Sequence, residues 1–150
     1  GYKVGLLEQA LRNQPVQLVH NANYNLGMYS SIQAGLAALD LTCTAFLLIP
    51  VDYPLVEALT FMKIIDFYNR NPAGIIYPTF QNRRGHPPLI STRYREEILA
   101  GDQPEGLKNL LNLHNDEALH IPVADPAILL DMDRKEDYQR LIRYYEEREA

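Results

Sequence analysis

The sequence predicts an α/β domain built on a mostly parallel sheet. Short apolar segments suited to strands alternate with longer segments in which apolar residues recur at helical spacing. The segment 44–49 is apolar without alternation and stops at Pro50, which is typical of a strand buried on both faces of a parallel sheet. Neither a repeat nor a Pro-, Gly- or Ser-rich linker divides the 150 residues, so we expect a single domain over 1–150.

The first half of the chain is expected to alternate between helices and strands around one loop. The Asn-rich stretch 20–27 is typical of a loop, because Asn tolerates left-handed backbone conformations. Ser30 or Ser31 is placed to cap the helix that follows, and Pro54 suits the first turn of the next helix. The elements expected in this half are a helix over 4–13, a strand over 16–19, a helix over 30–39, a strand over 44–49 and a helix over 54–70.

The second half is expected to continue with shorter elements. We expect strands over 74–78 and 89–91 on either side of a polar loop at 83–86, then helices over 92–100 and 104–113, strands over 120–123 and 128–132, and a helix over 135–149. The chain opens on a helix, without the strand that a parallel sheet normally places before it. This predicts that an N-terminal strand and loop are missing from the sequence.

The composition argues against several classes of partner. Fourteen basic and nineteen acidic residues give a net charge of −5, which disfavours binding to nucleic acid or to an anionic membrane surface. No apolar run reaches the length of a bilayer span. The single cysteine, Cys43, cannot form an internal disulfide, and the chain does not open with a secretion signal. We therefore expect a cytoplasmic protein that binds neither nucleic acid nor membrane.

Aspartates follow two of the predicted strands. Asp52 comes after 44–49, and Asp131 and Asp133 close 128–132. Ligands of open α/β sheets bind at the carboxyl ends of the strands. If these two ends converge, the aspartates could hold Mg²⁺, which prefers oxygen ligands and shares them with substrate phosphates. Two structural alternatives remain open: Asp52 caps the helix over 54–70, and Asp133 forms a capping box with Glu136.

The loop that enters the helix over 30–39 is a candidate anion site. Gly27 and Met28 precede this helix and Ser31 lies in its first turn. Free backbone N–H groups and the helix dipole favour an anionic ligand at such a position. The alternative is a tight turn followed by an ordinary helix cap.

A second candidate loop is basic. Arg84, Gly85 and His86 lie in the polar segment between two predicted strands. Guanidinium and imidazole groups beside a glycine could hold a phosphate or a pterin-like anion. A solvated hairpin loop with surface arginines is the alternative.

Four motifs in this order resemble the molybdenum cofactor cytidylyltransferase type of nucleotidyltransferase. The usual forms in that family are GMxxSLxxGL, a strand ending in DxPLV, GHP, and DIDTPEDY. The corresponding segments of this chain are GMYSSIQAGL (27–36), LLIPVDYPLV (47–56), RGHP (84–87) and LDMDRKEDY (130–138).

The resemblance implies a Rossmann-like, GT-A-like nucleotidyltransferase fold arranged as a three-layer sandwich. It also implies Mg²⁺-dependent transfer of a nucleoside monophosphate from an NTP to a phosphorylated small-molecule acceptor such as molybdopterin, with release of pyrophosphate. CTP is favoured over GTP, because GHP and Asp-Met-Asp match the cytidylyltransferase pattern better. A molybdoenzyme or its chaperone is the protein partner that this resemblance suggests.

The same resemblance implies roles for the candidate residues. Asp52 and Asp133 would be the catalytic pair that holds the metal. The nucleoside would lie along Gly27, Met28 and Ser31. The acceptor would face Arg84, Gly85 and His86.

The sequence also departs from the family pattern. The opening Gly-rich signature, LAAGxSxRMGxxK, is absent, Arg134 and Lys135 replace the usual Thr-Pro, and Tyr53 replaces the usual Gln after the metal aspartate. The chain would then represent the C-terminal three quarters of a nucleotidyltransferase domain and be inactive by itself. The alternative is a non-catalytic module that binds a nucleotide or cofactor and kept the fold without its triphosphate loop.

Overall fold

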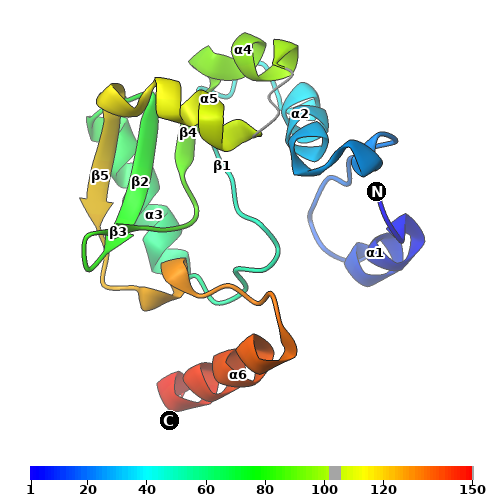
Figure 1. Cartoon of the computed structure of the whole chain (residues 1–150), viewed down its shortest axis with the longest axis vertical. Coiled ribbons are helices and arrows are strands. Elements are labelled where there is room, and N and C mark those ends of the chain that lie inside the picture. The colour runs from blue at the N-terminus through cyan, green and yellow to red at the C-terminus, as the bar shows by residue number, and fades with distance from the viewer. Residues whose placement is uncertain (102–105, 150) are drawn as a thin grey trace. The chain divides into compact units, whose positions relative to one another are not determined.

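The computed structural model describes residues 1–101 and 106–149 of the protein (Figure 1). The chain divides into two compact units, one formed by residues 1–44 and 93–113 and the other by residues 45–92 and 114–150. The expectation of a single nucleotidyltransferase domain stays a prediction.

The first unit is helical over its described residues. Helix 4–13 is confirmed, whereas the predicted strand 16–19 is wrong, because this segment has no regular structure and three of its apolar side chains are exposed. An apolar run forms a strand only where another strand pairs with its backbone. Helix 104–113 is confirmed from Leu107, and its first two predicted positions lie outside the described residues. The elements of the unit are α1 (Val4–Leu11), the 3-10 helix η1 (Tyr24–Leu26), α2 (Met28–Ala38), α4 (Arg95–Ala100) and α5 (Leu107–Leu113).

Helices α2 and α4 satisfy each other's C-terminal carbonyl groups. The last carbonyls of a helix have no partner within the helix itself. The side-chain amide of Gln33 in α2 donates to three carbonyls at the end of α4, at 3.0–3.1 Å. The guanidinium of Arg95 in α4 donates to two carbonyls at the end of α2, at 3.2 Å. These long-range hydrogen bonds fix the two helices relative to each other.

The second unit is built on one sheet. Its strands, among the described residues, are β1 (Ala45–Leu47), β2 (Ile75–Phe80), β3 (Arg83–Arg84), β4 (Leu89–Ser91) and β5 (Ala118–Pro122). β5 pairs in parallel with one edge of β2, while β3 and β4 pair in antiparallel fashion with the other edge. β4 also pairs in antiparallel fashion with β1. Therefore β1, β2 and β5 run in one direction, and the two strands of the short return segment run in the other.

The return segment has a local cause. Gln81 and Asn82 both adopt positive φ, at 50° and 64°, which is the geometry of a two-residue hairpin turn. The hairpin makes Arg83 and Arg84 a short strand, so the prediction of a loop over 83–86 is wrong for these two residues. The strand expected at 89–91 is confirmed.

Helix α3 (Ala58–Arg70) covers one face of this sheet. Ile64 packs with Ile76 and Leu89, and each of the three is at most 3% exposed. Burying such a side chain contributes about 1.5–3 kcal/mol. The helix begins at Ala58 rather than at Pro54, because the residue before it, Glu57, is extended, with φ −71° and ψ 142°.

The segment after β5 differs most from expectation. The predicted strand 128–132 is wrong: a 3-10 helix, η4 (Pro126–Leu129), occupies its start, and 130–133 has no regular structure. The Asp125 side chain caps η4 and Pro126 fills its first turn, which favours a helical start at this point. The last helix is confirmed as α6 (Lys135–Glu149). Within the described residues, no helix combines the length and apolar character needed to cross a membrane.

Candidate functional site

The candidate site lies where β1 and β2 end. These strands run in the same direction, so the residues that follow β1 and those that follow β2 leave the sheet at the same edge. Asp52 and Tyr53 follow β1, and β2 is followed by the hairpin turn, the short strand β3 and then residues 85 and 86. This is the edge at which open α/β sheets bind their ligands.

One carboxylate oxygen of Asp52 is left without a hydrogen bond. Its Oδ1 atom is buried and has no partner among the described residues. The alternative role as a helix cap is wrong, because α3 begins at Ala58 and has Glu57 as its N-cap residue. A buried carboxylate oxygen is costly unless a donor or a cation replaces its lost water. Asp52 is therefore arranged to meet a group that the described residues do not supply.

His86 lies beside Asp52 and shares this property. Its Nδ1 atom is buried and has no partner among the described residues. Burial lowers the pKa of His86, while a hydrogen bond with the Leu48 backbone and the charge of Asp52 oppose that shift. The Tyr53 ring packs against the imidazole, with 4.4 Å between ring centroids. Asp52 and His86, predicted separately from the sequence, are thus brought together.

The charges of three aspartates act on Tyr53. Burial raises the pKa of Tyr53, and the charges of Asp131, Asp52 and Asp133 raise it further, in that order. The aspartates that follow β1 and those that precede α6 therefore act on the same phenol. In the sequence Tyr53 is only a departure from a motif, whereas in the structure its ring packs against His86 and its pKa responds to the charges of the aspartates.

Asp133 does not cap α6. The Asp137 carboxylate accepts the hydrogen bond from the Arg134 backbone N–H, at 3.0 Å. The predicted capping box of Asp133 with Glu136 is therefore wrong by one residue. The strand geometry expected for Asp131 and Asp133 is also absent, since 130–133 is irregular. Asp131 is half-buried and Asp133 is exposed.

The aspartates at this edge fit a metal ion that also binds the substrate. No three His, Cys, Asp or Glu side chains in the described residues are grouped closely enough to hold a metal ion. Mg²⁺ commonly takes only one or two protein carboxylates and completes its shell with water and phosphate oxygens. The unpartnered Asp52 oxygen suits such a site, and Asp133 is the predicted second ligand.

Gly85 has a packing role at this edge. A Cβ atom at Gly85 would lie 2.4 Å from the backbone oxygen of Ile128, so a larger residue does not fit without displacement. Its N–H donates to the Pro78 carbonyl at 3.0 Å, and the N–H of His86 donates to the Ile128 carbonyl at 2.9 Å. This close approach holds His86 beside Asp52.

Gly27, Met28 and Ser31 belong to the first unit, whereas the residues described above belong to the second. Gly27 has φ 97° and ψ −178°, a conformation that is nearly restricted to glycine, and it is the N-cap residue of α2. The expected cap by Ser30 or Ser31 is wrong, because α2 has no side-chain cap. Met28 is exposed.

Asn21, which sequence reasoning missed, organises the loop before α2. This residue is only 8% exposed, and its side-chain amide donates to the hydroxyls of Ser30 and Ser31 at 2.8 and 2.9 Å. The Ser30 hydroxyl in turn donates to backbone carbonyls of the loop. The loop is therefore ordered by its own side chains.

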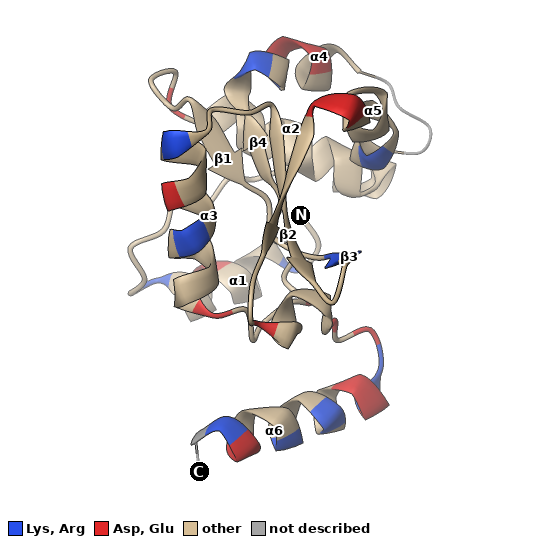
Figure 2. Cartoon of the chain, turned by 90° about the vertical axis from the view of Figure 1, so that its left-hand side faces the viewer, with Lys and Arg blue, Asp and Glu red and all other residues tan. Residues whose placement is uncertain are grey.

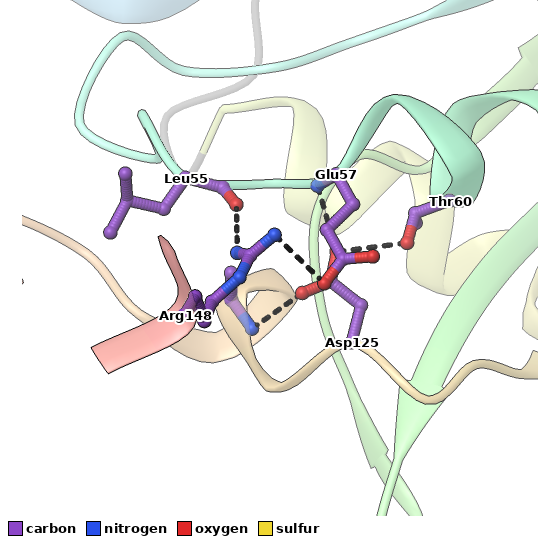
Figure 3. A network of polar contacts seen from close by, with 6 residues as sticks. Leu55, Glu57, Thr60, Asp125 and Arg148 are labelled. Carbon is purple, nitrogen blue, oxygen red and sulfur yellow. Dashed lines mark hydrogen bonds and ion pairs between the residues drawn. The ribbon is translucent and has the colours of Figure 1, made fainter. Parts of the chain in front are cut away.

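Asp125 is a second residue that sequence reasoning missed (Figure 3). It is 3% exposed, and its Oδ2 atom accepts from the Glu57 N–H at 2.9 Å and from the Thr60 hydroxyl at 2.8 Å. Its Oδ1 atom accepts from the Ala127 N–H at 2.9 Å. Arg148 in α6 pairs with the Glu57 carboxylate at 3.1 Å. The dipeptide Asp125-Pro126, a helix-start signal, could have indicated this residue.

The model of the MobA-like NTP transferase domain family matches residues 4–119. The chain belongs to this family. The comparison with curated proteins finds no match. Membership confirms the nucleotidyltransferase family that the four motifs resemble.

Solved structures of similar fold agree with this family. Rv0371c from Mycobacterium tuberculosis H37Rv has a TM-score of 0.66 and 25% identity, over 77% of this chain and 59% of that chain. A complex of the same protein with manganese has a TM-score of 0.58 and 25% identity, over 75% and 59% of the two chains. This chain therefore spans about three fifths of the length of Rv0371c.

Two more distant structures show the same fold. Molybdopterin-guanine dinucleotide biosynthesis protein A from Archaeoglobus fulgidus has a TM-score of 0.65 and 12% identity, over 91% of this chain and 72% of that chain. The 4-diphosphocytidyl-2C-methyl-D-erythritol synthase from Anaerococcus prevotii has a TM-score of 0.72 and 14% identity, over 95% and 74% of the two chains. The Rossmann-like α/β fold class is confirmed.

Proposed function

We propose that the protein is a divalent-metal-dependent nucleotidyltransferase, with Mg²⁺ as the natural metal. It transfers a nucleoside monophosphate, with CMP favoured, from an NTP to a phosphorylated small-molecule acceptor such as molybdopterin. The observation that carries the proposal is the buried, unpartnered Oδ1 atom of Asp52 at the carboxyl end of β1 in a MobA-like NTP transferase domain. The manganese complex of Rv0371c supports a divalent metal, and the name of the Archaeoglobus protein supports a molybdopterin acceptor.

The reaction forms one P–O bond and breaks another. A phosphate oxygen of the acceptor attacks the α-phosphorus of the NTP, the bond to the β-phosphate breaks, and pyrophosphate leaves with the electron pair. Asp52 and Asp133 would hold the metal. When bound, the metal neutralises negative charge on the α-phosphate as the new bond forms.

Other residues at this edge have roles that suit the same reaction. The lowered pKa of His86 favours a neutral imidazole, whose Nδ1 atom is available for a hydrogen bond to substrate. The raised pKa of Tyr53 keeps its hydroxyl protonated and able to donate. Arg84, Gly85 and His86 remain the residues proposed to face the acceptor.

The remaining parts of the proposal come from the sequence. Gly27, Met28 and Ser31 are proposed to lie along the nucleoside. The motifs at 84–87 and 130–138 favour CTP over GTP. A cytoplasmic location, with a molybdoenzyme or its chaperone as protein partner, completes the proposal.

The decisive experiment measures pyrophosphate release. The protein expressed from its complete reading frame is incubated with each of the four NTPs, a phosphorylated pterin, and Mg²⁺ or Mn²⁺. We expect release that requires both metal and acceptor and is fastest with CTP. Absence of release with every NTP and both metals contradicts the proposal.

Two variants connect the activity to the proposed metal site. Asp133→Asn should abolish release and weaken binding of the Mn²⁺–NTP complex, followed by electron paramagnetic resonance. Asp116→Asn removes an exposed carboxylate elsewhere in the same unit and is the matched control. If NTP binds to the wild type without turnover and Asp133→Asn binds equally well, the non-catalytic binding module is favoured instead.

A further inference from the structure

Arg84, which is proposed to face the acceptor, forms a cluster with two side chains of neighbouring strands that the proposed chemistry has not used. Arg84 on β3 donates from Nε to the Nε2 atom of His120 on β5, at 2.7 Å. The guanidinium carbon of Arg84 lies 4.7 Å from the ring centroid of Tyr77 on β2. The Tyr77 and His120 rings stack at 5.9 Å with 24° between their planes. We call these three residues the Arg84 cluster.

The Arg84 cluster lies on the sheet face opposite α3. Tyr77 and His120 are direct partners in the parallel pairing of β2 with β5. Their neighbours Ile76 and Ile121 are buried in the core beneath α3. Because successive side chains of a strand point to opposite faces, Tyr77 and His120 point away from that core.

Strand β3, which contributes Arg84 to the cluster, is a local concentration of positive charge in an acidic protein. Strand β3 consists of two exposed arginines, whereas the whole chain has a net charge of −5 (Figure 2). β3 follows the carboxyl end of β2, at the sheet edge where Asp52 follows β1. An anion approaching this edge on the face of Tyr77 and His120 would meet Arg84.

The contacts fix the Arg84 guanidinium in one orientation and leave part of it available. The one hydrogen bond that Arg84 makes with described residues uses Nε, so both terminal Nη groups remain available as donors. Their planar arrangement matches two oxygens of a phosphate. Holding the side chain in advance reduces the entropy lost when an anion binds.

The hydrogen bond requires a particular form of His120. An imidazole accepts at Nε2 only when it is neutral and carries its proton on Nδ1. Burial, and then the charge of Arg84, lower the pKa of His120, which favours this neutral form. His120 therefore acts on Arg84 as a hydrogen-bond acceptor rather than as a charge.

We propose that the Arg84 cluster is a phosphate-binding element, in which Arg84 contacts the phosphate and His120 and Tyr77 are positioning residues. The inference rests on the proposed function for the source of the phosphate, which would be that of the acceptor. The binding element itself can be tested without turnover.

The first test is a titration of the 150-residue chain with inorganic phosphate, followed by the NMR signal of the Arg84 Nε–H group. We expect phosphate to shift this signal, and Arg84→Gln to abolish specific binding. His120→Ala should weaken binding at least about tenfold, because a charge-assisted hydrogen bond no longer orients the arginine. His120→Gln should restore most of the affinity, since a glutamine oxygen can accept from Nε.

Arg83→Gln is the matched control, because it removes the same charge from the adjacent residue of β3. Side chains alternate along a strand, so Arg83 points to the face opposite that of Arg84. Equal weakening by Arg83→Gln and Arg84→Gln overturns the proposal, since it shows only a general charge effect. Unchanged affinity in His120→Ala overturns the positioning role. Backbone amide spectra of the sheet show that each variant is folded.

A kinetic measurement separates this inference from the proposed function. In protein that releases pyrophosphate, His120→Ala should raise the KM for the acceptor about tenfold and His120→Gln should restore most of it, because the arginine that His120 orients binds the acceptor phosphate. An unchanged KM in His120→Ala would overturn the proposed phosphate-binding role of the Arg84 cluster and leave the nucleotidyltransferase proposal intact. Phosphate binding that follows the expected pattern in protein without turnover would support the cluster and contradict the proposed activity.

Discussion

Asp52 and Asp125 belong to the same unit and both have buried carboxylate oxygens, but their surroundings are opposite. Asp125 accepts three hydrogen bonds, from Glu57, Thr60 and Ala127. The Oδ1 atom of Asp52 accepts none from the described residues. A carboxylate whose lone pairs are satisfied within the chain stabilises the fold, whereas one with a buried, unsatisfied oxygen costs stability and is suited to a ligand.

Removing the Asp125 carboxylate tests the structural half of this comparison and should have the largest effect. Asp125→Ala removes a helix cap and leaves buried donors without an acceptor, so we expect a loss of about 3 kcal/mol in the free energy of unfolding. Urea denaturation measures this loss. Thr60→Val, which removes only one of the three donors, should cost about 1 kcal/mol. A loss below about 1 kcal/mol in Asp125→Ala would contradict the structural role of Asp125 and with it the difference from Asp52.

Removing the charge of Asp52 tests the functional half. Asp52→Asn should change the free energy of unfolding by less than about 0.5 kcal/mol, because no hydrogen bond of the Oδ1 atom is lost. The rate of pyrophosphate release should fall at least about 100-fold, as expected when a ligand of the metal that neutralises transition-state charge is removed. Urea denaturation and the release assay are run on the same preparation. A destabilised variant with intact activity would reverse the assignment.

Gly85 lies between the two regions, because its backbone packs on Ile128 while His86 follows it. We expect Gly85→Ala to cost about 1–3 kcal/mol through overpacking against the Ile128 backbone. Thermal unfolding measures this cost. Gly35→Ala in α2 is the control, since nothing lies within 4 Å of the added Cβ, and it should be neutral or stabilising. Similar behaviour of the two variants would contradict the close approach at Gly85.

The smallest effect is expected for the ion pair between Glu57 and Arg148. This pair lies at the edge of the Asp125 network, the hydrogen bonds that Asp125 accepts from Glu57, Thr60 and Ala127. The Glu57–Arg148 ion pair joins side chains that are 33% and 35% exposed, where water and salt screen the interaction. Glu57→Gln should therefore cost about 0.2–1 kcal/mol and leave the backbone hydrogen bond to Asp125 in place. Unfolding at low and high salt measures the ion pair, and the cost should shrink as salt rises. A loss comparable to that of Asp125→Ala would show that the network depends on its ion pair.

The sequence predicts an element correctly where its apolar pattern and its start and stop residues all lie within the element itself. The helix over 135–149 and the strand at 89–91 have the predicted bounds. The predicted strands 16–19 and 128–132 are wrong because apolar composition does not show whether a partner backbone is present. The late start of α3 has a similar cause, since the Glu57 N–H is held by a residue 68 positions away.

The sequence predicts those site residues whose place in the fold depends only on their position relative to a strand or loop. Asp52 follows from the rule that ligands bind at the carboxyl ends of parallel strands, and His86 follows from the basic character of its loop. Tyr77 and His120 could not be found in this way, because their relation to Arg84 depends on the register of two strands that are distant in sequence. The roles of Asp133, Arg84 and Gly85 toward substrate stay predictions.

The Asp125 network also determines how the start of α3 unfolds locally. Amide hydrogens at the start of a helix usually exchange rapidly with solvent, because they have no partner in the preceding turn. The Glu57 amide is instead bonded to an aspartate that is 3% exposed. This N–H can exchange only when residues 57–60 separate from residues 125–127, which makes the two segments one cooperative unit. Its protection factor would then report the free energy of that opening.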